Sequence, residues 1–450
     1  MSAELVSSPA VTPADGRASM PPMRWPLVLL AAMSLLICTN GPSTFVGLNL
    51  LHPANLSFES WHFVYPFALV AIAGPVLLTR HVLSLSGQPA KSTNVRRWAV
   101  VPLALYLVIT VASATWSVAP NNTPVRALTG VGIAAFGVWF GAALGTREQA
   151  WSLFLGTQAG LVASAVVIAA RPAWGKTDPF LNLPYWKGIW GNRNSLGPVC
   201  ALAILATLAL IIMTVSRRSI AAGCMFVLFD VRMLLGAHSD TAIVALGSAL
   251  VMTALGGSLL TLVRRARVPG WIATAAVVPI AYGLWWLFFA KLSWFTGLAG
   301  KDTSLTSRRP FWAAVRSLIR VHPAKGYGYW AIWDSPVVAD VYAKLGAFGS
   351  AHNGLLEVLL AVGVIGGAPF LVFAAAAVHR PFELLWRRPS LGALLWIAIV
   401  TFAVIENLTE SFVLWHSYIW ILVVAAPFTS DGGEARTTTR YASRWWKPGS

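Results

Sequence analysis

The chain has 450 residues, of which 57% are hydrophobic and only 11% are charged, and its mean hydropathy is +0.67. Soluble domains carry about 25% charged residues, so this composition excludes an ordinary soluble enzyme, and the hydrophobicity excludes a disordered chain. The net charge of +17 would suggest nucleic acid in a soluble protein, but the basic residues lie between apolar runs, so we expect contacts with membrane lipids and lipid phosphates and no nucleic-acid partner.

Residues 1–24 are polar and rich in Ser, Pro and Ala, which predicts a disordered cytoplasmic tail. The apolar runs that follow are near the length of about 20 residues that a membrane-spanning helix needs. We expect spans at about 25–38, 60–79, 98–115, 125–145, 151–169, 195–214, 220–236, 241–263, 270–291, 353–378, 391–409 and 412–428. The sequence thus predicts an all-α polytopic protein: nine helices in 25–291, a long loop at 292–352 that carries short helices, three helices in 353–428, and a basic tail at 429–450.

The distribution of basic residues sets the expected orientation. An even number of spans puts both termini on one side, and the Lys and Arg residues of the short loops place that side in the cytoplasm. On the outer side the basic residues concentrate in two segments, 170–194 and 291–351. Because the short outer loops carry almost none, we interpret these two segments as candidate parts of a site.

The long outer segment contains a predicted amphipathic helix. Its apolar residues recur at helical spacing and are Phe311, Trp312, Val315, Leu318 and Ile319. Ser307 suits the N-cap position. On a helical wheel Arg309, Arg316 and Arg320 share one line, while Arg308 stands apart at the helix start. There a guanidinium and open backbone N–H groups would converge on an anion; a basic face resting on lipid headgroups fits the pattern equally.

His352 stands where the long loop enters an apolar helix. The helix dipole disfavours a protonated histidine at this end, and a neutral histidine can act as a base near pH 7. An interfacial histidine with a routine capping contact is the alternative, which the position alone favours slightly. Farther along this helix, Gly363, Gly366 and Gly367 have the small-residue spacing typical of helix packing.

Two further basic positions lie at expected outer ends of spans. Arg193 and Asn194 precede the span at 195–214, and Arg126 begins the span at 125–145. Each arginine suits phosphate binding or snorkelling to the interface, and the pattern does not separate the two.

The sequence carries no signal for metal or nucleotide chemistry. It contains no Asp-x-Asp pair, no phosphate-binding loop and no Gly-x-Ser-x-Gly element. We therefore expect no metal ligands and no cofactor.

Four motifs, in order, resemble the O-antigen ligase/Wzy-type polymerase family of bacterial membrane glycosyltransferases, with a pattern like that of exopolysaccharide polymerases. They are Trp116-Ser117 with Pro120 and Arg126; GIWGNRNSLG with Arg193 and Asn194; Leu305-Thr306-Ser307-Arg308 with Trp312, Pro323 and Gly326-Tyr327-Gly328; and His352-Asn353, nine residues before Gly363-x-x-Gly366. Ser307 stands where the family has glycine.

The resemblance implies a C-type glycosyltransferase-like fold in the bacterial cytoplasmic (inner) membrane, with an extracytoplasmic active site. It implies metal-independent, inverting transfer from a glycan on a polyprenyl diphosphate, such as undecaprenyl diphosphate, to a glycan or glycolipid acceptor. By the same resemblance His352 would be the base, and the diphosphate would be bound by Arg126, Arg193, Asn194 and Arg308. Asn353, Tyr327 and Trp333 would contact the acceptor or the sugars.

Two questions stay open at this point. A transporter or flippase for a lipid-linked or anionic substrate would also use basic outer loops, although it has no special need for a base at His352. Within the enzyme interpretation, the motifs fit both a polysaccharide polymerase and a ligase.

Overall fold

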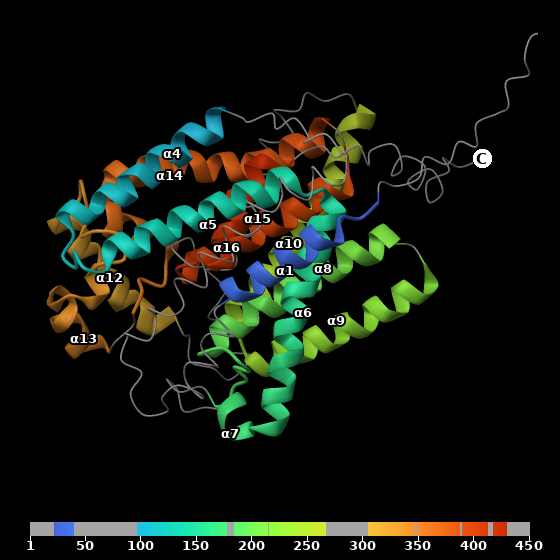
Figure 1. The fold of residues 1–450 in the computed structure, drawn as a ribbon, viewed down its shortest axis with the longest axis horizontal. Coiled ribbons are helices and arrows are strands. Elements are labelled where there is room, and N and C mark those ends of the chain that lie inside the picture. Colours follow the sequence, from blue (N-terminus) through green and yellow to red (C-terminus); the bar gives the residue numbers. More distant parts are fainter. Residues whose placement is uncertain are drawn as a thin grey trace, which may run out of the picture.

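The computed structural model describes residues 22–39, 97–177, 184–214, 216–266, 305–346, 349–387, 389–412 and 417–429. Within these ranges every regular element is helical (Figure 1). The all-α prediction is therefore confirmed for this part of the chain, and its apolar helices indicate a membrane protein.

Eight described helices are long and apolar enough to cross a membrane. They are α4 (Arg97–Ala112, continued by η3, Ser113–Trp116), α5 (Thr123–Ala143), α6 (Thr146–Ala170), α8 (Arg193–Thr214), α9 (Arg217–Ala237), α10 (Asp240–Ala266), α14 (Gly354–Arg387) and α15 (Leu391–Thr409). Two shorter apolar helices are α1 (Trp25–Cys38) and α16 (Tyr418–Ala425, continued by η6, Ala426–Phe428). The remaining elements are α7 (Pro172–Gly175), α12 (Leu305–Val321), η4 (Ile332–Asp334), η5 (Pro336–Val338) and α13 (Ala339–Leu345).

Most expected spans coincide with a helix. The span expected at 391–409 matches α15. The helix at the span expected at 353–378 is α14, which continues to Arg387, and the helix at the span expected at 412–428 is α16, which is shorter than expected. The spans expected at 60–79 and 270–291, and the tail residues 1–21 and 430–450, lie outside the described residues. Arg24, the last residue of the expected tail, contacts α6, where its Nε donates to Glu148 Oε1 at 2.8 Å.

The helices form a bundle with α4 and α14 along one side and α6, α8 and α9 along the other (Figure 1). Helices α5, α15 and α16 lie between them, and α12 and α13 lie at one end. Small residues allow close approach between α5 and α16. A Cβ atom added to Gly141 of α5 would lie 2.2 Å from the carbonyl oxygen of Ala425 in α16.

Several polar contacts between elements lie at the two ends of the bundle. At one end Trp116 Nε1 donates to Lys325 O and Trp190 Nε1 donates to Thr39 O, each at 3.0 Å. At the other end Arg24 binds Glu148, and Arg380 Nη2 donates to Thr429 O at 3.2 Å. These groups of contacts join segments that the sequence places outside and inside, respectively.

Helix α14 is broken at Gly363, which has φ 58° and ψ −162°. A Cβ atom at this position would lie 2.3 Å from the carbonyl oxygen of Ala324. The break leaves helical backbone groups open, and the segment 323–328 pairs with them: Val364 N with Pro323 O, Ile365 N with Ala324 O, Tyr327 N with Leu360 O and Gly328 N with Ala361 O. The segment 323–328 is thus inserted at the break in α14, and the nonhelical backbone there is satisfied by protein groups.

Candidate functional site

Helix α12 turns an apolar face to the protein and an arginine face away from it. Phe311 and Val315 are fully buried, while Arg309, Arg316 and Arg320 are exposed. The wheel drawn from the sequence is therefore confirmed. The Ser307 N-cap prediction is wrong, because the described helix begins at Leu305 and includes Ser307.

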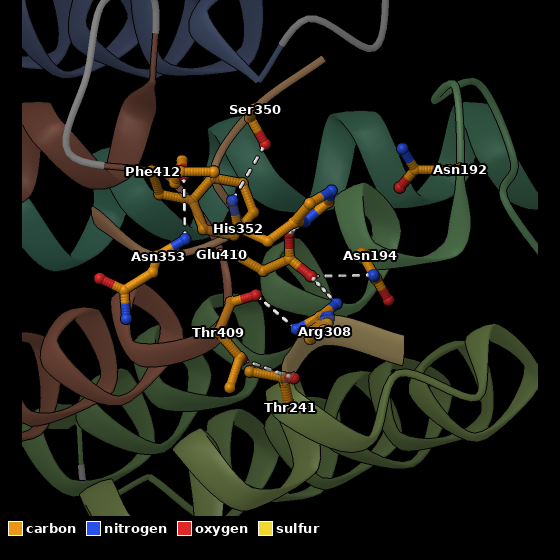
Figure 2. A network of polar contacts seen from close by, with 12 residues as sticks. Asn192, Asn194, Thr241, Arg308, Ser350, His352, Asn353, Thr409, Glu410 and Phe412 are labelled. Carbon is orange, nitrogen blue, oxygen red and sulfur yellow. Dashed lines mark hydrogen bonds and ion pairs between the residues drawn. The ribbon is translucent and has the colours of Figure 1, made fainter. Parts of the chain in front are cut away.

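Arg308 points away from the exposed arginine line and toward the end of α15. Its Nη2 lies 2.7 Å from Glu410 Oε1, and its Nη1 donates to the carbonyl oxygen of Thr409 (Figure 2). Only 13% of the Arg308 side chain is exposed. Two adjacent residues at one helix end therefore hold the guanidinium in one orientation. A bidentate contact to an anion needs such a fixed orientation.

His352 binds the same carboxylate from the other side. Its Nδ1 lies 2.8 Å from Glu410 Oε2 (Figure 2), and 22% of its side chain is exposed. Its φ of 46° is left-handed, which is uncommon for a residue other than glycine. Strain of this kind is often found at functional sites.

Asn353 fixes the helix start beside this histidine. Its Oδ1 accepts from Leu356 N and its Nδ2 donates to Leu408 O, both at 3.0 Å. The side chain therefore caps α14 and ties that end to the end of α15. This use of both amide atoms makes Asn353 a structural anchor for His352, whereas the sequence suggested a contact to the acceptor.

Asn194 is the third expected site residue that reaches this carboxylate. Its Nδ2 donates to Glu410 Oε1 at 2.9 Å (Figure 2). Three residues expected from the motifs thus meet on Glu410, which lies just beyond α15 and is 6% exposed. Glu410 itself was not identified from the sequence, although an acid in an apolar run is a functional candidate by default.

The electrostatics of the cluster favour an ionised Glu410. Burial alone would raise the pKa of this carboxyl, but the Arg308 and His352 side chains outweigh burial and lower the pKa from 4.5 to about 2. An ionised carboxylate only accepts hydrogen bonds. The His352 Nδ1 must therefore carry the donated proton, and the neutral ring then has its lone pair on Nε2.

Arg193 lies next to this cluster but has other partners. Its Nη1 donates to His238 O at 2.9 Å, and its guanidinium lies 4.6 Å from the centre of the Tyr185 ring. It follows the loop that carries Tyr185 and directly precedes Asn194 in α8. Arg193 is therefore positioned beside the site, at the same end of the bundle.

Arg126 contacts the segment around η4. It is 4% exposed, its Nη2 lies 2.5 Å from Asp334 Oδ2, and its Nη1 donates to Trp330 O at 2.6 Å. Its buried guanidinium fixes η4 and the residues before it onto the start of α5, and the position gives no support to a diphosphate contact.

The aromatic side chains expected to stack on sugars are inside the protein. Tyr327 and Trp333 are 3% and 6% exposed. The Tyr327 hydroxyl donates to Leu318 O at 2.9 Å, and its burial raises its pKa. Trp333 Nε1 donates to Glu357 Oε1 at 2.5 Å. Both rings therefore lie in the protein interior, and their positions do not support sugar stacking.

Within the described ranges, no group of three or more His, Cys, Asp or Glu side chains is placed to hold a metal ion. No protein-family model matches the chain, and no curated protein matches it. The functional interpretation therefore rests on the motifs and on the geometry around Glu410.

Proposed function

We propose that this chain is a membrane glycosyltransferase that transfers or polymerises a glycan carried on a polyprenyl diphosphate, at the outer face of a bacterial cytoplasmic membrane. The observation that carries the proposal is the meeting of His352 and Arg308 on Glu410. A base and a cation held together suit a displacement in which a hydroxyl loses a proton and a diphosphate leaves.

In this reaction His352 Nε2 accepts the proton of the acceptor hydroxyl. The acceptor oxygen forms a bond to the anomeric carbon, and the bond from that carbon to the diphosphate oxygen breaks with its electron pair on the diphosphate. Arg308 stabilises the charge that develops there, with Arg193 beside it. The proton then leaves His352 for the solvent, which reaches its partly exposed side chain.

The proposed enzyme is metal-independent, because arginine side chains supply the positive charge that a diphosphate needs. The donor is a lipid-linked glycan, and the acceptor is either a second lipid-linked glycan, as in a polymerase, or a different glycolipid, as in a ligase. Both uses leave the same lipid diphosphate as product.

The direct test uses purified protein in lipid nanodiscs and lipid-linked glycans extracted from a strain that lacks this gene. Release of free polyprenyl diphosphate, followed by mass spectrometry, is the expected result, and it should persist in EDTA. His352→Ala should abolish release. His379→Ala is the matched control, since His379 lies on the same helix and contacts Trp98 near the other end.

A transporter gives a different result in this assay. It would move the lipid-linked glycan across a sealed bilayer while the glycan stays attached to its diphosphate. Intact lipid-linked glycan after incubation with the wild-type protein, or full release by His352→Ala, contradicts the proposed function. Loss of release in EDTA, restored by Mg²⁺ or Mn²⁺, contradicts its metal independence.

A further inference from the structure

We propose that Glu410 is the positioning residue of this site, and that Asn194 acts through Glu410 instead of binding the diphosphate. One carboxylate thus sets the proton-accepting nitrogen of His352 and the place of Arg308. This inference rests on the proposed function and deepens it, because it says how the base and the leaving-group cation are held at a fixed distance from each other.

The two carboxylate oxygens have separate tasks. Oε2 lies 2.8 Å from His352 Nδ1, and Oε1 lies 2.7 Å from Arg308 Nη2. The hydrogen bond to Nδ1 selects the tautomer whose Nε2 takes up the proton. The distance between Nε2 and the guanidinium is then fixed by a single rigid group, and catalysis is sensitive to misplacement of about 1 Å.

Asn194 limits the rotation of this group. Its Nδ2 donates to Oε1 at 2.9 Å, so Oε1 accepts from an amide and a guanidinium at once. Both donors would be lost if the carboxylate turned about its last bond. An amide nitrogen used in this way supports Glu410, and residues that orient a catalytic group commonly affect rate without touching substrate.

The backbone of the preceding residue completes the arrangement. Arg308 Nη1 donates to Thr409 O, and the Thr409 hydroxyl lies 3.0 Å from the Thr241 hydroxyl of α10. Arg308 is therefore held by both the backbone and the side chain at the end of α15. Four elements meet there: α8 through Asn194, α10 through Thr241, α12 through Arg308, and the start of α14 through His352 (Figure 2).

The charges around His352 also require this carboxylate. Proton uptake makes an imidazolium close to the Arg308 guanidinium, and Glu410 is the anion in contact with both. Other charged or titratable groups near the cluster are Glu357 from α14, Glu406 one turn earlier in α15, and Arg193 at the start of α8. Glu410 does not take the proton; it stabilises the charged ring that holds it.

The test compares Glu410→Gln with the wild type in the release assay across a range of pH. The amide keeps the size of the side chain but has one acceptor oxygen and no charge. We expect kcat to fall by about 10²–10⁴-fold, as in other histidine bases that lose their carboxylate. The acid limb of the kcat/KM profile should move by about one pH unit toward lower pH, because the imidazolium has lost its counter-charge.

Asn194→Ala should lower kcat less than Glu410→Gln and leave the KM for the lipid-linked donor nearly unchanged. Glu148→Gln is the matched control: it breaks a buried Arg–Glu pair at the other end of the bundle and should leave the position of the acid limb unchanged. A variant that loses folded protein is recognised by its elution in size exclusion, and rates are expressed per folded protein.

The outcomes separate the inference from the function on which it rests. If the wild type releases no polyprenyl diphosphate, the proposed function fails. If the wild type is active but Glu410→Gln keeps its rate, or loses rate with an unmoved acid limb, then Glu410 is only structural and the inference is wrong. If the KM for the donor rises strongly in Asn194→Ala while kcat is unchanged, Asn194 binds the diphosphate and the inference is wrong for this residue.

Discussion

A buried pair of opposite charges such as Arg308 and Glu410 is a poor source of net stability. Removing both charges from water costs several kcal/mol per ion, and mutual attraction and hydrogen bonds must offset that cost. Here the carboxylate of Glu410 accepts hydrogen bonds from Arg308, Asn194 and His352, so both of its oxygens have donors. An arrangement of this kind fixes geometry more than it adds free energy of folding, which suits a site.

The two neighbouring arginines of α12 should respond differently to a conservative substitution. Arg308→Lys removes the planar fork that contacts both Glu410 and Thr409, and lysine does not replace such a fork. Loss of one donor to a developing charge typically lowers the rate by about 10²–10³-fold. Arg309→Lys should be mild, because Arg309 is exposed and only its charge would act.

Turnover of these two lysine variants in the release assay, with His352→Ala as the inactive reference, checks this prediction. Equal tolerance at both positions, or a greater loss at Arg309, would mean that the leaving-group arginine is misassigned.

Glu410 also makes stability depend on pH in a defined direction. The pKa of its carboxyl is about 2 in the folded protein against an ordinary 4.5. A lowered folded pKa means that this stabilisation is complete above about pH 4.5 and is lost as the pH falls toward 2. The difference in unfolding temperature between wild type and Glu410→Gln should shrink as the pH falls from about 4.5 toward 2. Thermal unfolding in detergent measures it, and a difference that does not change with pH would contradict it.

The residues around Glu410 show what sequence patterns leave out. Glu410 is separated by 58, 102 and 216 positions from His352, Arg308 and Asn194. Helical periodicity tells which residues share a face of one helix, but not which helix ends meet. The motifs therefore indicated three of the four residues, and only packing reveals the acid on which they meet. The buried positions of Arg126, Tyr327 and Trp333 were hidden for the same reason.

At the scale of elements, α12 and α14 differ in how well the sequence described them. The apolar face of α12 follows from a spacing that a straight helix obeys, and it was predicted correctly. The break in α14 does not follow from composition, because Gly363, Gly366 and Gly367 fit ordinary helix packing equally well. Gly363 instead has a positive φ and admits the segment 323–328.

Gly363→Ala should therefore be far more damaging than Gly367→Ala. At Gly363 a Cβ atom would overlap backbone atoms of Ala324, and the backbone conformation is one that alanine rarely adopts. We expect a loss of about 3 kcal/mol or more, from strain and overlap together. At Gly367, within the described part of the chain, a Cβ atom would meet only Leu359 Cδ2 at 3.0 Å, and this is a movable methyl group.

Unfolding temperature and release activity of the two alanine variants, at matched expression, test this element. Similar stability of both variants would show that the break at Gly363 is dispensable for the fold.

At the scale of the whole molecule, the side chains exposed on the bundle are those of a protein solvated by lipid. Large apolar side chains are exposed on α4, α9 and α14, among them Val108 at 64%, Met225 at 72%, Leu228 at 70% and Val372 at 57%. Patches of this kind on a protein in water mark an interface or an aggregation hazard. Together with helices of 19 to 34 residues that are apolar enough to span, they indicate that the middle of the bundle lies in the membrane.

The two ends of the bundle should then face opposite sides of the membrane, with the Glu410 cluster outside. Ala339, in α13, is exposed at the end that holds this cluster, and Arg218, in the first turn of α9, is exposed at the opposite end. We expect Ala339→Cys to react with a membrane-impermeant maleimide in intact cells, and Arg218→Cys to react only after permeabilisation. The labelling uses a Cys224→Ala background, because Cys38 and Cys200 are buried whereas Cys224 is exposed. Labelling of Arg218→Cys in intact cells, with Ala339→Cys protected, would reverse the orientation and place the proposed site on the cytoplasmic side, where a donor presented from the outer leaflet would not reach it.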